Sequence, residues 1–406
     1  MKITELRVQG YRSLKDVTWR PGDLNVLIGP NGGGKSNLLR VLQLLQAAAD
    51  RRLSKWIQRE GGMIPMVWDG SATQFCIEVV SESPGQESAE HAERLLYRLL
   101  LARRGSTGDY FVPEEFLGKL PTPTDRADGE HSTYFEAARF GPEMPAEAGG
   151  GGAGVGKITS PREAMLGIFG GEPFPQAPVR SFHAQVLGWA VYCDFHTGRD
   201  SVVRQSAVSR HEPCVNAMGD NLVCVLHTLY TNSREFRHDI DSAMSAVFGE
   251  DYEELIFPPE SDQRIQLRVR WKSMTRAQSA ADLSDGMLRF LYLLAILANP
   301  EPPPLIAIDE PETGLHPRMQ HVIAEFTVDA ARRTQVVLTT HSPEFLDSYD
   351  STIPRVTVVE PEPGAGTALR NLCGDELKRW TREFGLGEIM RTNSVEAIQT
   401  EQESGG

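Results

Sequence analysis

Apolar residues are spaced in two ways along this chain, and the two spacings predict different elements. Mostly apolar runs without a polar face, which are typical of buried parallel strands, occur at residues 24–28, 304–308 and 335–338. Apolar positions that recur with a helical period predict helices over residues 36–49, 221–231, 235–248 and 288–298. Because buried strands and helices share the chain, the pattern predicts an α/β fold.

The first apolar run leads into a glycine-rich turn, Gly29-Pro30-Asn31-Gly32-Gly33-Gly34-Lys35-Ser36, and a helical run follows. The turn fits the phosphate-loop pattern G-x-x-x-x-G-K-[ST] in its strand–turn–helix context. Glycines let backbone N–H groups point at phosphates, and the new helix presents its positive end to the same charge. We expect Lys35 to reach the β- and γ-phosphates of ATP and Ser36 to ligate Mg²⁺. The flanking elements disfavour the alternative, a glycine-rich turn without a ligand.

Two carboxylates, Asp309 and Glu310, come at the end of the second apolar run. Open α/β sheets bind their ligands at the carboxyl ends of parallel strands. We expect Asp309 to hold the Mg²⁺ shell and Glu310 to polarise the attacking water. A strand that ends in Asp-Glu is common and is often only a capped turn, but the phosphate loop favours catalysis. The two stretches together predict ATP hydrolysis.

Two weaker motifs lie before and after these carboxylates in the sequence. Ser284-Asp285-Gly286 opens the apolar helix at 288–298, and His341 follows the third apolar run. A Ser-x-Gly turn at a helix start offers a hydroxyl and free N–H groups to an anion, although alone it is better explained as a serine N-cap. A single histidine after a strand is usually structural.

The phosphate loop, the Ser-x-Gly turn, the Asp-Glu strand end and the histidine after a strand follow one another along the chain. In this order the four motifs resemble those of the ABC-type ATPases. The resemblance implies an α/β P-loop NTPase fold, similar to the two-lobed ATPase head of SMC proteins, with a mixed sheet and a helical insertion. It also implies a head-to-tail homodimer, closed by ATP, in which Ser284 and Gly286 act on the partner's nucleotide and His341 contacts the γ-phosphate and its water. The implied ATP-binding residues are Arg12, Gly29, Asn31, Gly32, Gly33, Gly34, Lys35, Ser36, Asn37, Ser284 and Gly286.

Two further stretches resemble the soluble branch of this family, typified by SMC proteins, RecF and the OLD nucleases. Residues 3–14 look like the start of those proteins, where Arg12 would lie near the nucleotide, and residues 309–317 match the soluble "DEPE-x-GLHP" form rather than a transporter. The resemblance is to compact bacterial AAA-family ATPases without a coiled coil. The residues after His341 are too few for a TOPRIM nuclease domain. Gln74 is the best candidate for the Q-loop glutamine, which is not securely placed.

Breaks in composition divide the chain into five segments. We expect an ATPase N-terminal lobe with the phosphate loop, then a partly disordered insertion and a mainly helical segment. An ATPase C-terminal lobe follows, with the Ser284-Asp285-Gly286 turn (the signature), the Asp-Glu pair and His341, and the chain ends in a C-terminal extension with a disordered end. These segments are residues 1–105, 106–160, 161–260, 261–350 and 351–406. Prolines and a glycine run at 149–154 mark the insertion.

Net charge and cysteine content indicate which partners and which compartment suit the protein. The net charge of −14 does not favour binding to the phosphate backbone of a nucleic acid. Five cysteines without a C-x-x-C pair indicate a reducing compartment. The longest apolar run is about half a membrane span, and no signal peptide is recognised. We therefore expect a cytoplasmic protein with no membrane contact.

Two clusters have open alternatives. Arg51, Arg52, Lys55 and Arg59 surround Trp56 after the phosphate-loop helix, and they form either a solvated helix end or a DNA contact. Cysteines and histidines spaced like zinc ligands lie at Cys193, His196, His211 and Cys214, but the aromatic residues around them favour a packed core.

The sequence favours an enzyme: a Mg²⁺-dependent ATPase that forms an ATP-sandwich dimer. We expect it to act in DNA repair or maintenance, or in defence against phage, together with a separate effector. The alternative is a slow nucleotide-gated switch or scaffold that regulates a partner protein without binding DNA.

Overall fold

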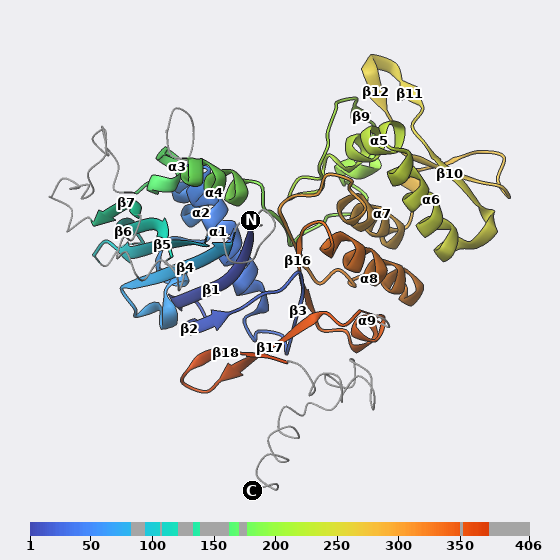
Figure 1. Ribbon diagram of the computed structural model, residues 1–406. Coiled ribbons are helices and arrows are strands. Elements are labelled where there is room, and N and C mark those ends of the chain that lie inside the picture. Colours follow the sequence, from blue (N-terminus) through green and yellow to red (C-terminus); the bar gives the residue numbers. More distant parts are fainter. Residues whose placement is uncertain are drawn as a thin grey trace, which may run out of the picture. The chain divides into compact units, whose positions relative to one another are not determined.

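A computed structural model of the chain describes residues 1–82, 94–105, 108–120, 133–138, 162–169, 177–349 and 352–372. The chain divides into two compact units, each built from separate parts of the sequence (Figure 1). Unit 1 comprises Met1–Gly22, Gly29–Trp189 and Thr357–Asn371. Unit 2 comprises Asp23–Ile28, Ala190–Val356 and Leu372–Gly406. The glycine run at 149–154 and residues 373–406 lie outside the described residues, so the expected disorder there stays a prediction.

Unit 1 contains an antiparallel sheet. In spatial order, its strands are β2 (Leu14–Trp19), β1 (Lys2–Tyr11), β4 (Gln74–Glu82), β5 (Arg94–Arg103), β6 (Tyr110–Lys119) and β7 (Thr133–Ala138). Residues on β4 and β5 alternate between buried and partly exposed positions, as expected of a sheet with one covered face. Strands β6 and β7 lie within residues 106–160, so part of the expected insertion extends this sheet.

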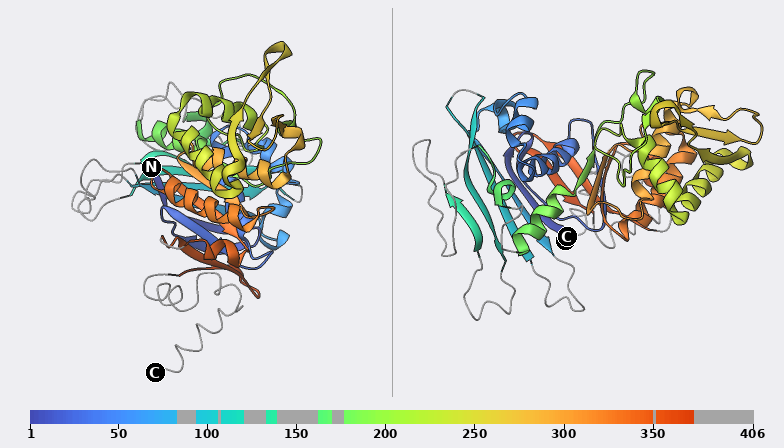
Figure 2. Two further views of the ribbon diagram at one scale, coloured as in Figure 1. Left: turned by 90° about the vertical axis from the view of Figure 1, so that its right-hand side faces the viewer. Right: turned by 90° about the horizontal axis from the view of Figure 1, so that it is seen from above.

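Four helices lie over one face of the unit 1 sheet (Figures 1 and 2). They are α1 (Lys35–Ala49), α2 (Leu53–Arg59), α3 (Met165–Phe169) and α4 (Ala177–Leu187). The ring of Phe182 on α4 packs against Tyr97 on β5, with ring centroids 5.3 Å apart. A hairpin of β17 (Arg355–Glu362) and β18 (Gly366–Asn371) contacts β2 in the same unit. Short 3-10 turns are η1 (Ile64–Met66) and η2 (Trp68–Gly70).

Unit 2 contains the parallel strands that the apolar runs predict. Their spatial order is β3 (Leu24–Ile28), β16 (Gln335–Thr340), β15 (Leu305–Asp309) and β8 (Ala190–Tyr192). All residues of β3 and β16 are buried, because helices and loops cover both faces. The parallel register pairs Asp309 with Thr339, which brings the carboxyl ends of β15 and β16 to the same edge.

The helices of unit 2 are α5 (Leu222–Asn232), α6 (Arg234–Phe248), α7 (Asp285–Leu297), α8 (Pro317–Ala331) and α9 (Pro343–Asp347). Helix α7 packs between α5 and α8 and is almost wholly buried, whereas α8 also packs on β16. Two small antiparallel sheets complete the unit: β10 (Tyr252–Ile256) with β13 (Arg268–Trp271) and β14 (Gln278–Ser279), and β11 (Pro259–Glu260) with β12 (Arg264–Ile265) and β9 (Ala207–Val208). The 3-10 turns are η5 (Val202–Arg204), η6 (Gly249–Asp251), η7 (Ser261–Gln263) and η8 (Ala280–Asp282).

Most predicted elements match the structure closely. The strand expected at 24–28 is β3, and the helices expected at 36–49 and 235–248 are α1 and α6 with starts one residue earlier. The division into five segments stays a prediction. No helix within the described ranges is long and apolar enough to cross a membrane.

Candidate active site

The phosphate loop in unit 1 is shaped by glycines that no other residue replaces easily. Gly29, Gly32 and Gly34 have φ of 143°, 79° and 115°, a region that side chains disfavour. A Cβ at Gly29 would collide with the Val359 carbonyl oxygen, and one at Gly33 would lie 2.7 Å from the same atom. No side chain caps the start of α1. A bare helix start next to a close-packed backbone loop fits an anionic phosphate group.

Lys35, the cation of this loop, is 5% exposed. Its Nζ donates hydrogen bonds to the main-chain oxygens of Gly29 at 2.6 Å and Pro30 at 3.0 Å. The ammonium therefore lies against the first two residues of the loop. A phosphate in the loop would compete with these carbonyl oxygens for the same cation.

Asn37 is directed at the β1–β2 turn. Its Nδ2 donates to Ser13 Oγ at 2.9 Å. Thr367 Oγ1, from β18, lies 2.8 Å from the same hydroxyl and donates to the Gly33 carbonyl oxygen at 2.9 Å. Ser13 and Thr367 thus brace the phosphate loop. Neither was predicted as a site residue, since nothing in the local sequence links Thr367 to a loop so far away in the chain.

Arg12 is held by an acidic side chain in unit 1. Its guanidinium is paired with Glu60, and Arg40 Nη1 lies 2.7 Å from the same Glu60 carboxylate oxygen. Arg12 has a positive φ of 47°, and its amide donates to the Met66 carbonyl oxygen at 2.8 Å. Glu60 was not predicted from the sequence. The role of Arg12 near a nucleotide stays a prediction.

Asp309 and Glu310 lie at the carboxyl end of β15 in unit 2. Thr339, on the neighbouring strand, donates its hydroxyl to Asp309 and accepts the Glu310 amide at 3.0 Å. Glu310 has a left-handed φ of 48°, a conformation that costs a non-glycine residue about 1–3 kcal/mol. Arg289 Nη2, from α7, donates to the Glu310 carbonyl oxygen at 3.0 Å. Strain held in place by neighbouring hydrogen bonds is typical of functional sites.

His341 meets Glu310 in this unit. Its Nδ1 lies 3.2 Å from Glu310 Oε1 and 3.6 Å from Glu312 Oε1. The parallel pairing of β15 and β16 explains the meeting, because both residues directly follow adjacent strand ends. The carboxylate and the imidazole assigned to water activation are thus brought together. The sequence did not single out Glu312 or Arg289 as site residues.

The predicted signature lies at the start of α7. Ser284 Oγ accepts the Met287 amide at 3.2 Å, so the serine is an N-cap. A Cβ on Gly286 would lie 2.9 Å from the Gly314 carbonyl oxygen, so the signature packs closely on the turn after Glu310. Arg204, 9% exposed, donates to the Leu283 carbonyl oxygen at 2.7 Å and fixes the approach to the turn. Action of Ser284 and Gly286 on a partner's nucleotide stays a prediction.

The basic cluster at 51–59 is partly occupied by local contacts. Arg51 donates to the carbonyl oxygens of Gly167 at 2.7 Å and Ile168 at 3.1 Å, and Arg52 pairs with Asp50. Lys55 and Arg59 are exposed. Arg51 and Arg52 thus have local partners, and the choice between a solvated helix end and a DNA contact stays open.

The zinc alternative has no support in unit 2. His196 pairs with Asp200 at 3.2 Å, and Cys214 lies 3.5 Å from Asn299 Nδ2. Over the part of the chain that the structure describes, no group of three or more His, Cys, Asp or Glu side chains is arranged to hold a metal ion. Gln74, the candidate Q-loop residue, is exposed at the start of β4 in unit 1.

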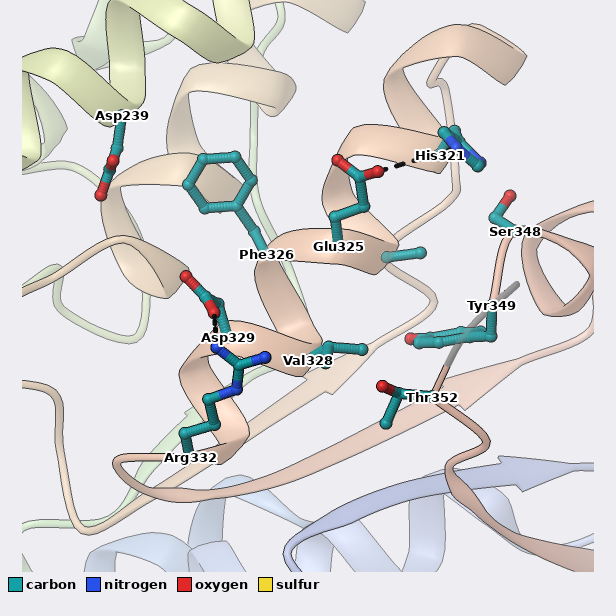
Figure 3. A pocket seen from close by; sticks show the side chains of 11 residues that line it. Asp239, His321, Glu325, Phe326, Val328, Asp329, Arg332, Ser348, Tyr349 and Thr352 are labelled. Atoms are coloured by element: carbon teal, nitrogen blue, oxygen red, sulfur yellow. Dashed lines mark ion pairs between the residues drawn. The ribbon is translucent and has the colours of Figure 1, made fainter.

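A cavity of about 330 Å³ in unit 2 lies away from these motifs (Figure 3). Helix α8 supplies most of its lining, which includes the ion pair of Asp329 and Arg332 at 2.9 Å and that of His321 and Glu325 at 3.8 Å. Asp239 on α6 also lines it. None of the predicted nucleotide-site residues does.

Two family models match the chain. One, described as "AAA domain, putative AbiEii toxin, Type IV TA system", matches residues 226–347. The other, described as "AAA ATPase domain", matches residues 1–83. The first range contains the signature turn, the Asp309-Glu310 pair and His341, and the second contains the phosphate loop and Arg12.

Curated relatives resemble parts of the chain. The chromosome partition protein Smc of Methylococcus capsulatus is 30% identical over 122 residues, 28% of this chain and 10% of that protein. The DNA replication and repair protein RecF of Bifidobacterium longum subsp. infantis is 28% identical over 132 residues, 31% of this chain and 30% of that protein. The Nod factor export ATP-binding protein I of Rhizobium leguminosarum bv. viciae is 44% identical over 94 residues, 23% of this chain and 28% of that protein. The chain thus spans at most 30% of the length of these relatives.

Solved structures resemble nearly the whole fold. The SmcHead bound to the C-winged helix domain of ScpA has a TM-score of 0.54 at 11% identity, covering 93% of this chain and 100% of that chain. The Smc head domain with an extended coiled coil from Pyrococcus furiosus, bound to the C-terminal domain of ScpA, has a TM-score of 0.53 at 11% identity, covering 94% and 98%. The predicted P-loop fold, similar to an SMC head, is confirmed. Together with the family models and the relatives, it makes the chain similar to AAA-family ATPases and to SMC and RecF proteins.

Proposed function

We propose that this protein is a Mg²⁺-dependent ATPase that closes into a head-to-tail homodimer around two ATP molecules. It acts in DNA repair or maintenance, or in defence against phage, through a separate effector. The observation that carries the proposal is the phosphate loop, in which Gly29, Gly32 and Gly34 have left-handed φ and Lys35 is buried beside them. The family matches to AAA domains support the same activity.

The residues have separate roles in this proposal. Lys35 and the loop amides of residues 29–36 bind the phosphates, while Ser36 and Asp309 ligate Mg²⁺, which neutralises charge on the transferred phosphoryl group. Glu310 orients the attacking water and accepts its proton. His341 contacts the γ-phosphate. The 3.2 Å contact between His341 Nδ1 and Glu310 Oε1 supports joint action of these two side chains.

A homodimer and a protein partner are supported by different observations. Ser284 and Gly286 lie in an exposed or half-buried turn at the start of α7, where a second subunit has access to them. The similar SMC head structures are complexes with parts of ScpA, a separate protein. A separate effector for this ATPase would bind in a comparable manner, and cytoplasmic residence agrees with such a role.

Steady-state ATP hydrolysis tests the proposal, measured with and without double-stranded DNA and Mg²⁺. Hydrolysis that DNA stimulates supports a role in repair or defence. Slow hydrolysis that is indifferent to DNA supports instead a nucleotide-gated switch that regulates a partner protein. Failure of the purified protein to bind or hydrolyse ATP overturns the proposal.

The Glu310→Gln variant is the sharpest form of this test. Glutamine keeps the shape and the hydrogen-bond acceptor of Glu310 but accepts no proton, so we expect hydrolysis to fall about 10²- to 10⁴-fold. ATP binding is retained, and the dimer should accumulate in ATP as seen by light scattering. The matched variant Glu325→Gln changes an exposed carboxylate on α8 and should behave as the parent. If Glu310→Gln turned over at the parental rate, Glu310 would not be the base.

A further inference from the structure

Glu312 is a buried carboxylate beside His341 in unit 2, outside the predicted catalytic set. Its side chain is only 4% exposed. Its Oε1 accepts the Thr340 hydroxyl at 2.5 Å and the His341 amide at 3.2 Å. Its Oε2 is buried and has no hydrogen-bond partner among the described residues. An unpaired buried polar atom costs about 1–3 kcal/mol, so an unpaired carboxylate oxygen in this place calls for an explanation beyond capping a turn.

Two carboxylates face the same nitrogen of His341. Glu310 Oε1 lies 3.2 Å from Nδ1, and Glu312 Oε1 lies 3.6 Å from it. A carboxylate at Nδ1 keeps the proton on that nitrogen and fixes the ring plane, so that Nε2 points away from the pair. The imidazole thus lies within ion-pair distance of two carboxylates.

The two partners differ in their freedom to move. The Glu310 side chain is 36% exposed, and it can rotate toward solvent or a bound water molecule. Glu312 cannot rotate without breaking its bonds to Thr340 and to the His341 amide in a buried site. When Glu310 turns toward water, Glu312 is therefore the carboxylate that stays beside the ring.

A guanidinium, that of Arg289, also lies near the two carboxylates. Arg289 interacts electrostatically with both Glu310 and Glu312. Burial raises the pKa of Glu312, and the bonds from Thr340 and from the His341 amide oppose that rise. Burial lowers the pKa of the Arg289 guanidinium, and Tyr292 and the two nearby carboxylates oppose this shift only in part. The group is a compact set of two acids, one imidazole and one guanidinium.

We propose that Glu312 is a positioning residue for ATP hydrolysis, which holds the His341 ring in its working orientation while Glu310 turns to the attacking water. This inference rests on the proposed ATPase function. Glu312 touches neither nucleotide nor water in this role. It acts through His341, by contact with both the amide and Nδ1 of that residue.

Kinetics of Glu312→Gln give the first test. Glutamine keeps an acceptor for Thr340 and the His341 amide but loses the charge that orients Nδ1, so kcat should fall about tenfold, as with other orienting partners. The KM for ATP should change less than about twofold, because substrate binding is not affected. Glu312→Ala also loses the hydrogen-bond acceptor, so its kcat should be lower than that of Glu312→Gln.

Glu115→Gln is the matched control for loss of a buried carboxylate. Glu115 in unit 1 is 0% exposed, and it accepts the Tyr97 hydroxyl at 2.8 Å and the Leu166 amide at 2.9 Å. This variant should lose thermal stability but keep the parental kcat per folded molecule. If Glu312→Gln lowered kcat no more than Glu115→Gln does, the positioning role would be excluded.

Nitrogen NMR of protein labelled at histidine shows which ring nitrogen of His341 carries the proton, and a change in stability alone does not alter this. The His341 signals are assigned by their loss in His341→Gln. With a non-hydrolysable ATP analogue bound, when Glu310 turns to the water, the parent should report a proton fixed on Nδ1 and Glu312→Gln a mixture of both neutral tautomers. A parent that lacks ATPase activity refutes the proposed function. An active parent whose His341 signals and kcat are unchanged in Glu312→Gln refutes the positioning role alone.

Discussion

Lys35 Nζ donates a 2.6 Å hydrogen bond to the main-chain oxygen of Gly29, the first residue of its own phosphate loop. The bond closes the loop on itself through its only basic side chain. Because the ammonium is 5% exposed, most of its hydration has been replaced by protein oxygens. Phosphate oxygens carry a full charge where carbonyls carry a partial one, so they compete well for the same cation.

The Lys35→Ala variant should therefore lose ATP binding. A hydrogen bond to a charged group contributes about 1.5–3 kcal/mol, which corresponds to about a 10- to 150-fold rise in Kd. Titration with a fluorescent ATP analogue measures the change. Lys55→Ala, which removes an exposed lysine on α2, should leave Kd unchanged. A Kd for Lys35→Ala within twofold of the parent would show that the loop does not bind phosphate.

Two glycines of the loop should differ in their tolerance of alanine. A Cβ at Gly34 would collide with Thr367 and lie 3.0 Å from Ser13 Oγ, whereas one at Gly32 meets nothing within 4 Å. Both have positive φ, so both variants bear backbone strain, but only Gly34→Ala also has to displace the braces of the loop. Left-handed strain alone costs about 1–2 kcal/mol in both variants, and we expect the Kd of Gly34→Ala for ATP to exceed that of Gly32→Ala by about tenfold or more. Equal effects would exclude bracing by Ser13 and Thr367.

The sequence predicted the parts of the site that local patterns encode. The strand at 24–28, the glycine loop, the acidic end of β15 and His341 after β16 are each short segments whose residue types follow from a single element. Parallel pairing then brings Glu310 and His341 together, as a buried strand pair requires. Ser284 also matches its simplest interpretation, an N-cap of α7.

The residues that sequence reasoning missed are those that act from another segment. Thr367 braces Gly33, Glu60 holds Arg12, and Arg289 holds the Glu310 carbonyl, each across a long sequence separation. Residues 264–271 hold two short strands with different partners, since β12 pairs with β9 and β11 while β13 pairs with β10 and β14. Alternation shows that a run is extended but not which strand it joins.

Arg204 should be essential for the stability of unit 2. Its guanidinium donates to the buried carbonyl oxygens of Ala280 at 3.1 Å and Leu283 at 2.7 Å. Arg204→Ala leaves these acceptors unpaired, at a cost of about 1–3 kcal/mol each. Thermal unfolding should show a lower Tm, while Arg332→Ala, at a side chain 74% exposed, should show no change. A parental Tm for Arg204→Ala would mean that water replaces the guanidinium.

Mixing two inactive variants tests whether the signature acts on the partner's nucleotide. Glu310→Gln disables hydrolysis at its own phosphate loop but keeps ATP binding and the signature turn. Ser284→Asp keeps the N-cap of α7, since aspartate caps as well as serine, but directs a negative charge at the phosphate. In a head-to-tail dimer the mixed species has one site with both defects and one site with none.

The mixture should therefore regain activity that neither variant has alone. At equal concentrations half of the dimers are mixed and each has one intact site, so we expect about a quarter of the parental rate, as a symmetric pairing of two subunits requires. The control is a mixture of Ser284→Asp with the double variant Glu310→Gln, Ser284→Asp, in which no dimer contains an intact site. Recovery in that control, or none in the first mixture when both variants still dimerise in ATP, would show that Ser284 acts within its own subunit or not at all.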